Sequence, residues 1–110
     1  MGRVVLLNSL PLNALPLKQL SITVTPVTLD DLRTALVCNH FENYIRHPAT
    51  IQLLNRLLDI TAKLQPSSEL YQYQEGDIIY VISLKRPVRG KEVENVKPSD
   101  IQVWKVSINE

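Results

Sequence analysis

The chain has 110 residues, the usual length of one domain, and its 45% hydrophobic content with only three glycines predicts a folded globule. Its net charge of +1 excludes the strongly basic surface of a general duplex-binding protein, so we expect no DNA partner. No run of about 18 apolar residues predicts a membrane span, and the start of the chain does not resemble a signal peptide, which favours a cytoplasmic location. One cysteine, Cys38, and two histidines cannot form a disulfide or a zinc site within one chain, and we expect neither a metal nor another cofactor.

The first part of the chain predicts two strands. Arg3 to Leu7 is a short apolar run rich in β-branched residues, typical of a buried strand, and it stops at the turn formers Asn8 and Ser9. Residues 10–16 contain two prolines and predict an ordered loop. Ser21 to Val27 alternates with a period of two and predicts a second strand, which its proline places toward the edge of a sheet.

Two helices are expected next. Thr28, with Asp31 three residues later, resembles a capping box and opens a helix whose apolar positions have helical spacing. Residues 39–46 give no clear assignment. His47-Pro48 then opens a second helix, because proline suits the first helical position, and this helix is predicted to continue to about Ala62.

The second part of the chain reads mainly as strands. Leu70 to Tyr73 and Ile78 to Leu84 are predicted strands joined by a turn at residues 75–77, and Ile101 to Ile108 is a predicted final strand after a turn at residues 98–100. Lys85 to Lys91 is predicted to be a basic loop. The order of these elements predicts an α/β or α+β fold: one small domain, residues 1–110, with a mixed β-sheet flanked by helices. Such a small chain would gain stability from forming a homodimer.

His47 is the strongest candidate for chemistry. It lies at or beside the N-cap of the second predicted helix, where free N–H groups and the helix dipole favour an anion. Thr50 would lie in the first turn of the same helix. An imidazole there can transfer a proton to or from a bound phosphate ester, because histidine titrates near neutrality. The alternative is that His47 only caps the helix, and from the residues alone both interpretations stay open.

The other candidates are polar groups that could hold a phosphate or a sugar. Asn8 and Ser9 follow the first strand, and ligands of α/β sheets gather beyond the carboxyl ends of strands. Arg46 precedes the histidine, and Arg86 and Arg89 lie in the basic loop, where a guanidinium could bind two phosphate oxygens at once. Their alternatives are an ordinary turn and a solvated hairpin tip.

Three segments together resemble the viral ring nuclease family, the type III anti-CRISPR proteins of archaeal viruses and their bacterial and mobile-element relatives. Val4-Val5-Leu6-Leu7-Asn8-Ser9 is similar to the family's opening strand and turn, and His47-Pro48-Ala49-Thr50 is similar to its His-x-x-Thr helix start. Tyr80 to Arg86, with Gly90-Lys91, resembles the strand that leads to its basic loop. The resemblance covers nearly the whole chain.

The resemblance implies a homodimeric, metal-independent nuclease that cleaves the second messenger cyclic tetra-adenylate to linear di-adenylate products and so switches off type III CRISPR signalling in antiviral defence. It implies His47 as the catalytic residue and Asn8 and Arg86 as substrate contacts. The chain departs from the family pattern at Arg46, where the family has glycine, and at Arg89, near a family glutamate. A protein that binds or sequesters a cyclic oligoadenylate without cleaving it is therefore the alternative function, and a small dimeric interaction protein without a nucleotide pocket is a third.

Overall fold

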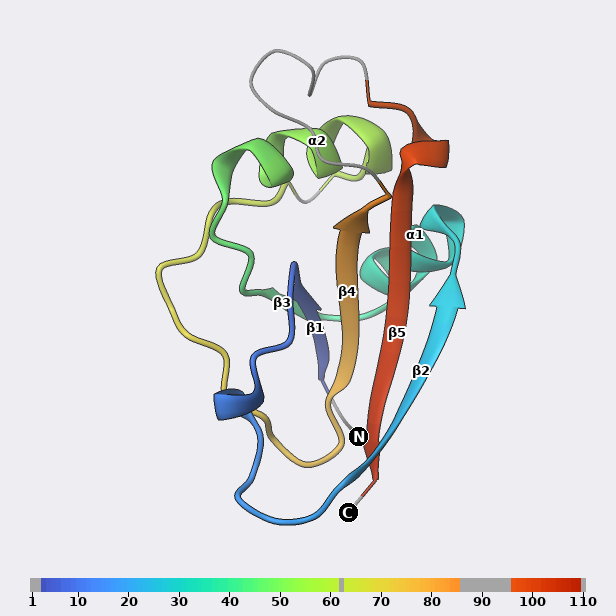
Figure 1. Ribbon diagram of the computed structural model, residues 1–110. Coiled ribbons are helices and arrows are strands. Elements are labelled where there is room, and N and C mark those ends of the chain that lie inside the picture. The colour runs from blue at the N-terminus through green and yellow to red at the C-terminus, as the bar shows by residue number, and fades with distance from the viewer. Residues whose placement is uncertain (1–2, 62, 86–95, 110) are drawn as a thin grey trace.

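The computed structural model describes residues 3–61, 63–85 and 96–109 and folds as one small α/β domain with a five-stranded mixed sheet (Figure 1). The elements in chain order are β1 (Val4–Leu7), a 3-10 turn (Leu12–Ala14), β2 (Ser21–Val27), α1 (Leu29–Cys38), β3 (Phe41–Asn43), α2 (Pro48–Leu58), β4 (Ile78–Leu84), a 3-10 turn (Pro98–Asp100) and β5 (Ile101–Asn109). The predicted single domain with a mixed sheet and two helices is confirmed.

The order of strands across the sheet is β2-β5-β4-β1-β3. β1 lies between β3 and β4 and is parallel to both, whereas β5 is antiparallel to β4 and to β2. β2 is thus an edge strand, as its Pro26 predicts, since a proline cannot donate a ladder hydrogen bond. All four residues of β1 are buried, as expected of a strand in the middle of a sheet with both faces covered.

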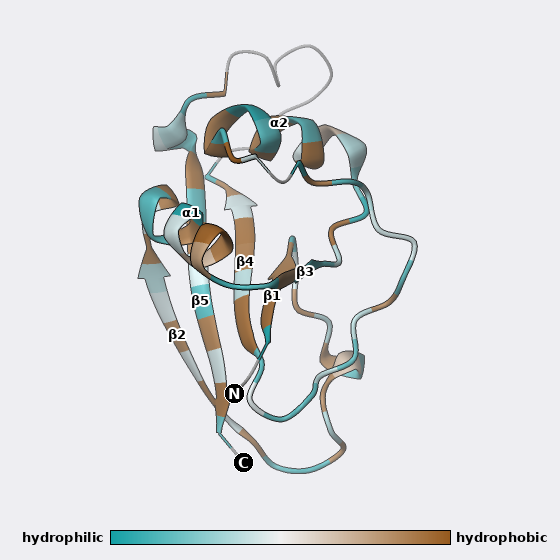
Figure 2. Cartoon of the chain, turned by 180° about the vertical axis from the view of Figure 1, so that it is seen from behind, coloured by the Kyte–Doolittle hydropathy of each residue, from teal (hydrophilic) through white to brown (hydrophobic). Residues whose placement is uncertain are grey.

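Two apolar clusters cover the two faces of the sheet. The larger joins the sheet to the helices through fully buried side chains such as Leu32 of α1 and Leu54 and Leu58 of α2. Figure 2 shows α1 across this face of the sheet, with α2 beyond the upper end of β4. On the other face, Tyr71 and Ala14 from the loops pack against the sheet, chiefly against Val5 and Ile79. No described helix is long and apolar enough to cross a membrane.

Thr28 and Asp31 form the predicted capping box at the start of α1. The Thr28 hydroxyl accepts a hydrogen bond from the Asp31 backbone N–H at 3.0 Å, and the Asp31 carboxylate accepts one from the Thr28 N–H at 3.0 Å. Hydrogen bonding to the carboxylate from Thr28 lowers the pKa of Asp31, the Thr28 backbone N–H being the larger cause and its side chain the smaller. The signal in the sequence was local, and the structure confirms it.

Three details of the predicted elements differ from the structure. The expected strand Leu70–Tyr73 is irregular, because its polar backbone groups bond elsewhere: Gln72 O accepts from Arg3 at 3.0 Å and Tyr73 N donates to Ala14 O at 2.9 Å. The second helix ends at Leu58 rather than near Ala62. The unassigned stretch 39–46 contains the short strand β3.

Candidate functional site

α2 begins where the sequence predicts, with His47 at its N-cap and Pro48 as its first helical residue. His47 has an extended backbone, φ −76° and ψ 115°, and its carbonyl accepts the bond from Ile51 N at 3.2 Å. Its side chain makes no capping hydrogen bond and is exposed. His47 is therefore the N-cap residue through its backbone, while its imidazole takes no part in capping and is accessible to a ligand.

The segment that leads into α2 is held firmly to the sheet. Ile45, two residues before His47, is fully buried, and Tyr44 N donates to Leu6 O of β1 at 2.9 Å. The Asn43 carboxamide accepts from Ile45 N at 3.0 Å and donates to Gln65 O at 2.8 Å. These bonds fix the backbone that leads into His47.

Asn8 and Thr50, which lie 42 positions apart in the sequence, line one hollow of about 260 Å³. Asn8 directly follows β1, and the hollow is also lined by Ser83 and Leu84 at the end of β4. Because β1 and β4 are parallel, their carboxyl ends meet at the same edge of the sheet, which is where ligands bind in α/β folds. The prediction that Asn8 and Thr50 share a site is consistent with this hollow.

The remaining candidate residues lie around this edge or outside the described chain. Ser9 and Arg46 are exposed and, like His47, do not line the hollow itself. His47 and Thr50 are three positions apart at the start of α2, about one helical turn. Arg86 and Arg89 fall outside the described residues. Lys85, the residue just before them, follows β4 and donates its N–H to Asp100 O at 2.8 Å.

α2 is also held at its other end, by residues that the sequence did not single out. Arg33 of α1 donates from Nε to Leu58 O at 2.7 Å and from Nη2 to Leu57 O at 3.2 Å, and Asp59 takes the left-handed conformation with φ 49°. Cations at a helix C-terminus are favourable partners for its free carbonyls. No local pattern signals this role, since Arg33 reaches α2 across the fold.

A second polar group of residues lies at the amino ends of β1, β3 and β4. Arg3 donates from Nε to Asp77 Oδ1 at 2.8 Å and from Nη1 to the Tyr44 hydroxyl at 3.0 Å, and Tyr71 donates to Asp77 Oδ2 at 2.5 Å. We call Arg3, Glu42, Tyr44, Tyr71 and Asp77 the Arg3 cluster. Bonding to Asp77 raises the pKa of Arg3, and burial raises that of Tyr71. The donors and acceptors of these side chains hydrogen-bond to one another, so we regard the Arg3 cluster as structural.

The described part of the chain contains no group of three or more His, Cys, Asp or Glu side chains that could hold a metal ion. The side chains at the carboxyl edge of the sheet offer proton transfer by the His47 imidazole and hydrogen bonding by the Asn8 amide and the hydroxyls of Ser9, Thr50 and Ser83.

Comparison with known proteins places the chain in a viral family. Its fold is similar to that of B116 of Sulfolobus turreted icosahedral virus, with a TM-score of 0.76, 24% sequence identity, and coverage of 96% of this chain and 98% of that one. No curated protein matches the chain. The STIV B116-like family model matches residues 4–108, from β1 to β5, and the chain therefore belongs to the STIV B116-like family.

Proposed function

We propose that the chain is a metal-independent ring nuclease that opens cyclic tetra-adenylate to linear di-adenylate products, with His47 as its catalytic residue. The observation that carries the proposal is the exposed imidazole at the N-cap of α2, beside the hollow that Asn8 and Thr50 line. The resemblance of the same segments to the viral ring nucleases gives this arrangement its substrate. Membership of the viral STIV B116-like family supports a role in which an invader silences type III CRISPR signalling.

The proposed reaction needs no redox partner. The ribose 2′-oxygen attacks the adjacent phosphorus in line, the P–O5′ bond breaks, and a 2′,3′-cyclic phosphate and a free 5′-hydroxyl result. One proton leaves the 2′-hydroxyl and one is taken up by the 5′-oxygen. His47 transfers one of these protons. N–H groups at the start of α2 and the Asn8 amide stabilise charge on the phosphate oxygens.

The substrate-binding set that we propose comprises Asn8 and Thr50 at the hollow, the exposed Ser9 and Arg46, and Arg86 and Arg89, which lie outside the described residues. We propose a homodimer, because a two-fold axis matches a cyclic ligand of four equal units and sets two copies of His47 at opposite phosphates. The dimer is measured by light scattering coupled to size exclusion, at protein concentrations that span the assay.

The decisive experiment incubates the protein with labelled cyclic tetra-adenylate in excess EDTA. We expect linear di-adenylate products, and a His47→Ala variant that still binds the ring but cleaves it about 10²–10⁴-fold more slowly. His40→Ala is the matched control, since His40 is also exposed but lies outside the site, and it should cleave at the wild-type rate. Cleavage by His47→Ala at the wild-type rate would show the assignment to be wrong.

One residue favours a second candidate function. Arg89 stands near the position where the resembled family carries a glutamate, and loss of that acid could leave a protein that binds or sequesters cyclic oligoadenylate without cleaving it. Tight binding of the ring with no products in the same assay would establish this function. If the protein neither binds nor cleaves the ring, both proposals are refuted.

A further inference from the structure

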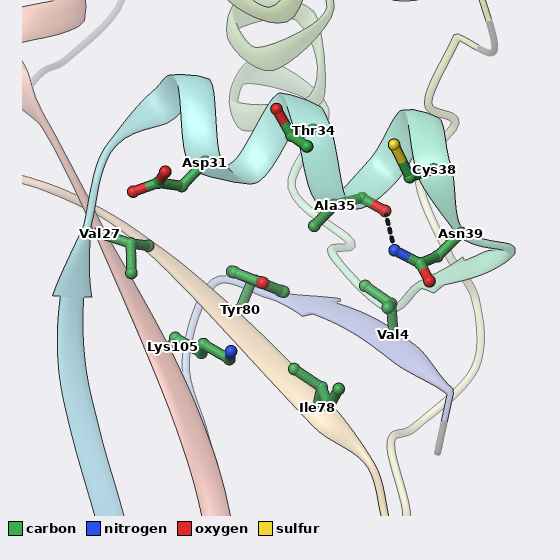
Figure 3. Close-up of a pocket in the computed structure, with 10 residues that line it drawn as sticks. All are labelled: Val4, Val27, Asp31, Thr34, Ala35, Cys38, Asn39, Ile78, Tyr80 and Lys105. Atoms are coloured by element: carbon green, nitrogen blue, oxygen red, sulfur yellow. Dashed lines mark hydrogen bonds between the residues drawn. The ribbon is translucent and has the colours of Figure 1, made fainter. Parts of the chain in front are cut away.

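A hollow of about 610 Å³, larger than the one beside α2, lies between α1 and the sheet. Figure 3 shows the residues that line it: Asp31, Thr34, Ala35 and Cys38 of α1, Asn39 directly after the helix, Tyr80 and Ile78 of β4, Lys105 of β5, Val27 and Val4. It shares no lining residue with the hollow of Asn8 and Thr50, so it is a separate site. Its volume falls within the range of about 300–1,000 Å³ that is usual for small-molecule sites.

Tyr80 is the residue that marks this hollow as a binding site. Its side chain is buried, at 7% exposure, yet its hydroxyl has no hydrogen-bond partner among the described residues. In Figure 3 the phenol oxygen faces the viewer, into the space beneath α1. Burial, and then the negative charge of Asp31, raise the pKa of Tyr80, so the hydroxyl keeps its proton and can donate it in a hydrogen bond. No buried side-chain donor among the described residues lacks a partner, so the unbonded Tyr80 hydroxyl is reached by solvent through the hollow and is free to donate to a ligand there.

Lys105 supplies a second donor beside the first. It is the direct cross-strand partner of Tyr80 in the β4–β5 ladder, so the two side chains leave the sheet on the same face. Lys105 is partly buried, and over the described ranges no carboxylate lies within ion-pair distance of it. The carboxylate of Asp31, across the hollow, is engaged in the capping box with Thr28.

The rest of the lining combines four apolar residues with Thr34, Cys38 and Asn39. Val4, Val27, Ala35 and Ile78 contribute hydrocarbon surface to the hollow. The two donors, Tyr80 and the cationic Lys105, favour an acceptor-rich or anionic group in the ligand. The neighbouring apolar side chains favour an apolar part next to that group.

We propose that this hollow binds a small organic anion, with its anionic head on Lys105 and the Tyr80 hydroxyl and its compact apolar body against Val4, Ala35 and Ile78. A carboxylate and a phosphate monoester share this chemistry. The site is independent of the proposed nuclease reaction.

The test is an NMR titration of the uniformly ¹⁵N-labelled full chain with hexanoate, hexyl phosphate, inorganic phosphate and the neutral analogue hexanamide. We expect saturable shifts of amides in α1, β4 and β5 with hexanoate or hexyl phosphate, and which of the two binds more tightly identifies the head group. Hexanamide and inorganic phosphate should bind at least about tenfold more weakly, because each lacks one of the two features.

Variants distinguish binding in this hollow from nonspecific binding of anions elsewhere on the protein. Lys105→Gln and Tyr80→Phe should each weaken binding of the preferred anion about tenfold, whereas Lys63→Gln, at an exposed lysine outside the hollow, should leave its affinity unchanged. His47→Ala should also bind it with wild-type affinity, so the outcome does not depend on the nuclease. Absence of saturable shifts, equal binding of hexanamide, or unchanged affinity in Lys105→Gln would overturn the proposal.

Discussion

Replacement of Asp77 by alanine tests how strongly the Arg3 cluster supports the fold. The Asp77 side chain is 1% exposed and accepts four hydrogen bonds from three residues: from Arg3 Nε at 2.8 Å and Nη2 at 3.3 Å, from the Tyr71 hydroxyl at 2.5 Å and from Gln74 N at 3.0 Å. In Asp77→Ala all three lose that acceptor, and the Arg3 guanidinium keeps only Glu42, the Tyr44 hydroxyl and a carbonyl as partners.

The magnitude follows from burial. Removal of one partner of a buried ion pair costs about 3–5 kcal/mol. Here Arg3 keeps Glu42 as a counter-ion, which places the cost at the lower end of that range. The Arg3 side chain is 20% exposed and can recover some water, so we expect about 3 kcal/mol. That is a large share of the roughly 5–15 kcal/mol by which such domains are stable, and it corresponds to a fall in Tm of roughly 10–20 °C.

The assay is urea unfolding followed by far-UV circular dichroism, on Asp77→Ala, on Asp30→Ala and on the double variant Arg3→Met/Asp77→Leu. Asp30, whose side chain is 86% exposed, also pairs with an arginine, Arg33, and its loss should cost less than about 0.5 kcal/mol. The double variant should be more stable than Asp77→Ala, since it removes both buried charges and leaves unpaired only Glu42, whose side chain is 45% exposed. A loss below about 1 kcal/mol in Asp77→Ala would refute this account of the cluster.

Three further changes have defined outcomes. Leu54→Ala removes a fully buried side chain of α2 and should lower the free energy of unfolding by about 2–5 kcal/mol in urea. Because the pKa of Asp31 is lowered in the folded chain, its charged form stabilises the fold at pH values above the ordinary pKa of 3.8, and this stabilisation is lost as the pH falls through the lower pKa of the folded state. In Asp31→Asn, the midpoint of urea unfolding should therefore change less with pH in the acid range. Asn43→Ala leaves Ile45 N without its acceptor and should cost about 1–2 kcal/mol in the same assay. Under the proposed nuclease function, it should also slow single-turnover cleavage of cyclic tetra-adenylate more than it weakens binding of the ring.

Elements whose signals are local could be predicted from the sequence. The starts of both helices are signalled by residues within a few positions of each start: the capping box of Thr28 and Asp31 for α1, and Pro48 for α2. The alternation in residues 21–27 predicts a strand, and Pro26 predicts that it lies at the edge of the sheet. A proline has no N–H to donate, which is tolerated on the side of an edge strand that has no neighbouring strand.

Elements that depend on distant partners could not be predicted. The segment 70–73 has the composition of a strand, but its backbone groups are bonded elsewhere. Arg3 donates to the Gln72 carbonyl, and the Tyr73 N–H donates to the Ala14 carbonyl, so the segment lies over the sheet as irregular chain. α2 stops at Leu58 because Arg33 binds its last carbonyls. In both cases an arginine more than 20 positions away decides the outcome.

The same distinction applies to the two candidate sites. Asn8 could be placed at the end of a strand and Thr50 in the first turn of a helix, but only the parallel pairing of β1 with β4 brings the carboxyl ends of these strands to one edge, where both residues line the hollow. Tyr80 and Lys105 carry no motif, and their shared face depends on the register of an antiparallel pair, which a shift of one residue would reverse. Chemistry that depends on strand register therefore becomes visible only in the folded chain, whereas a histidine at a helix start can be found from the sequence.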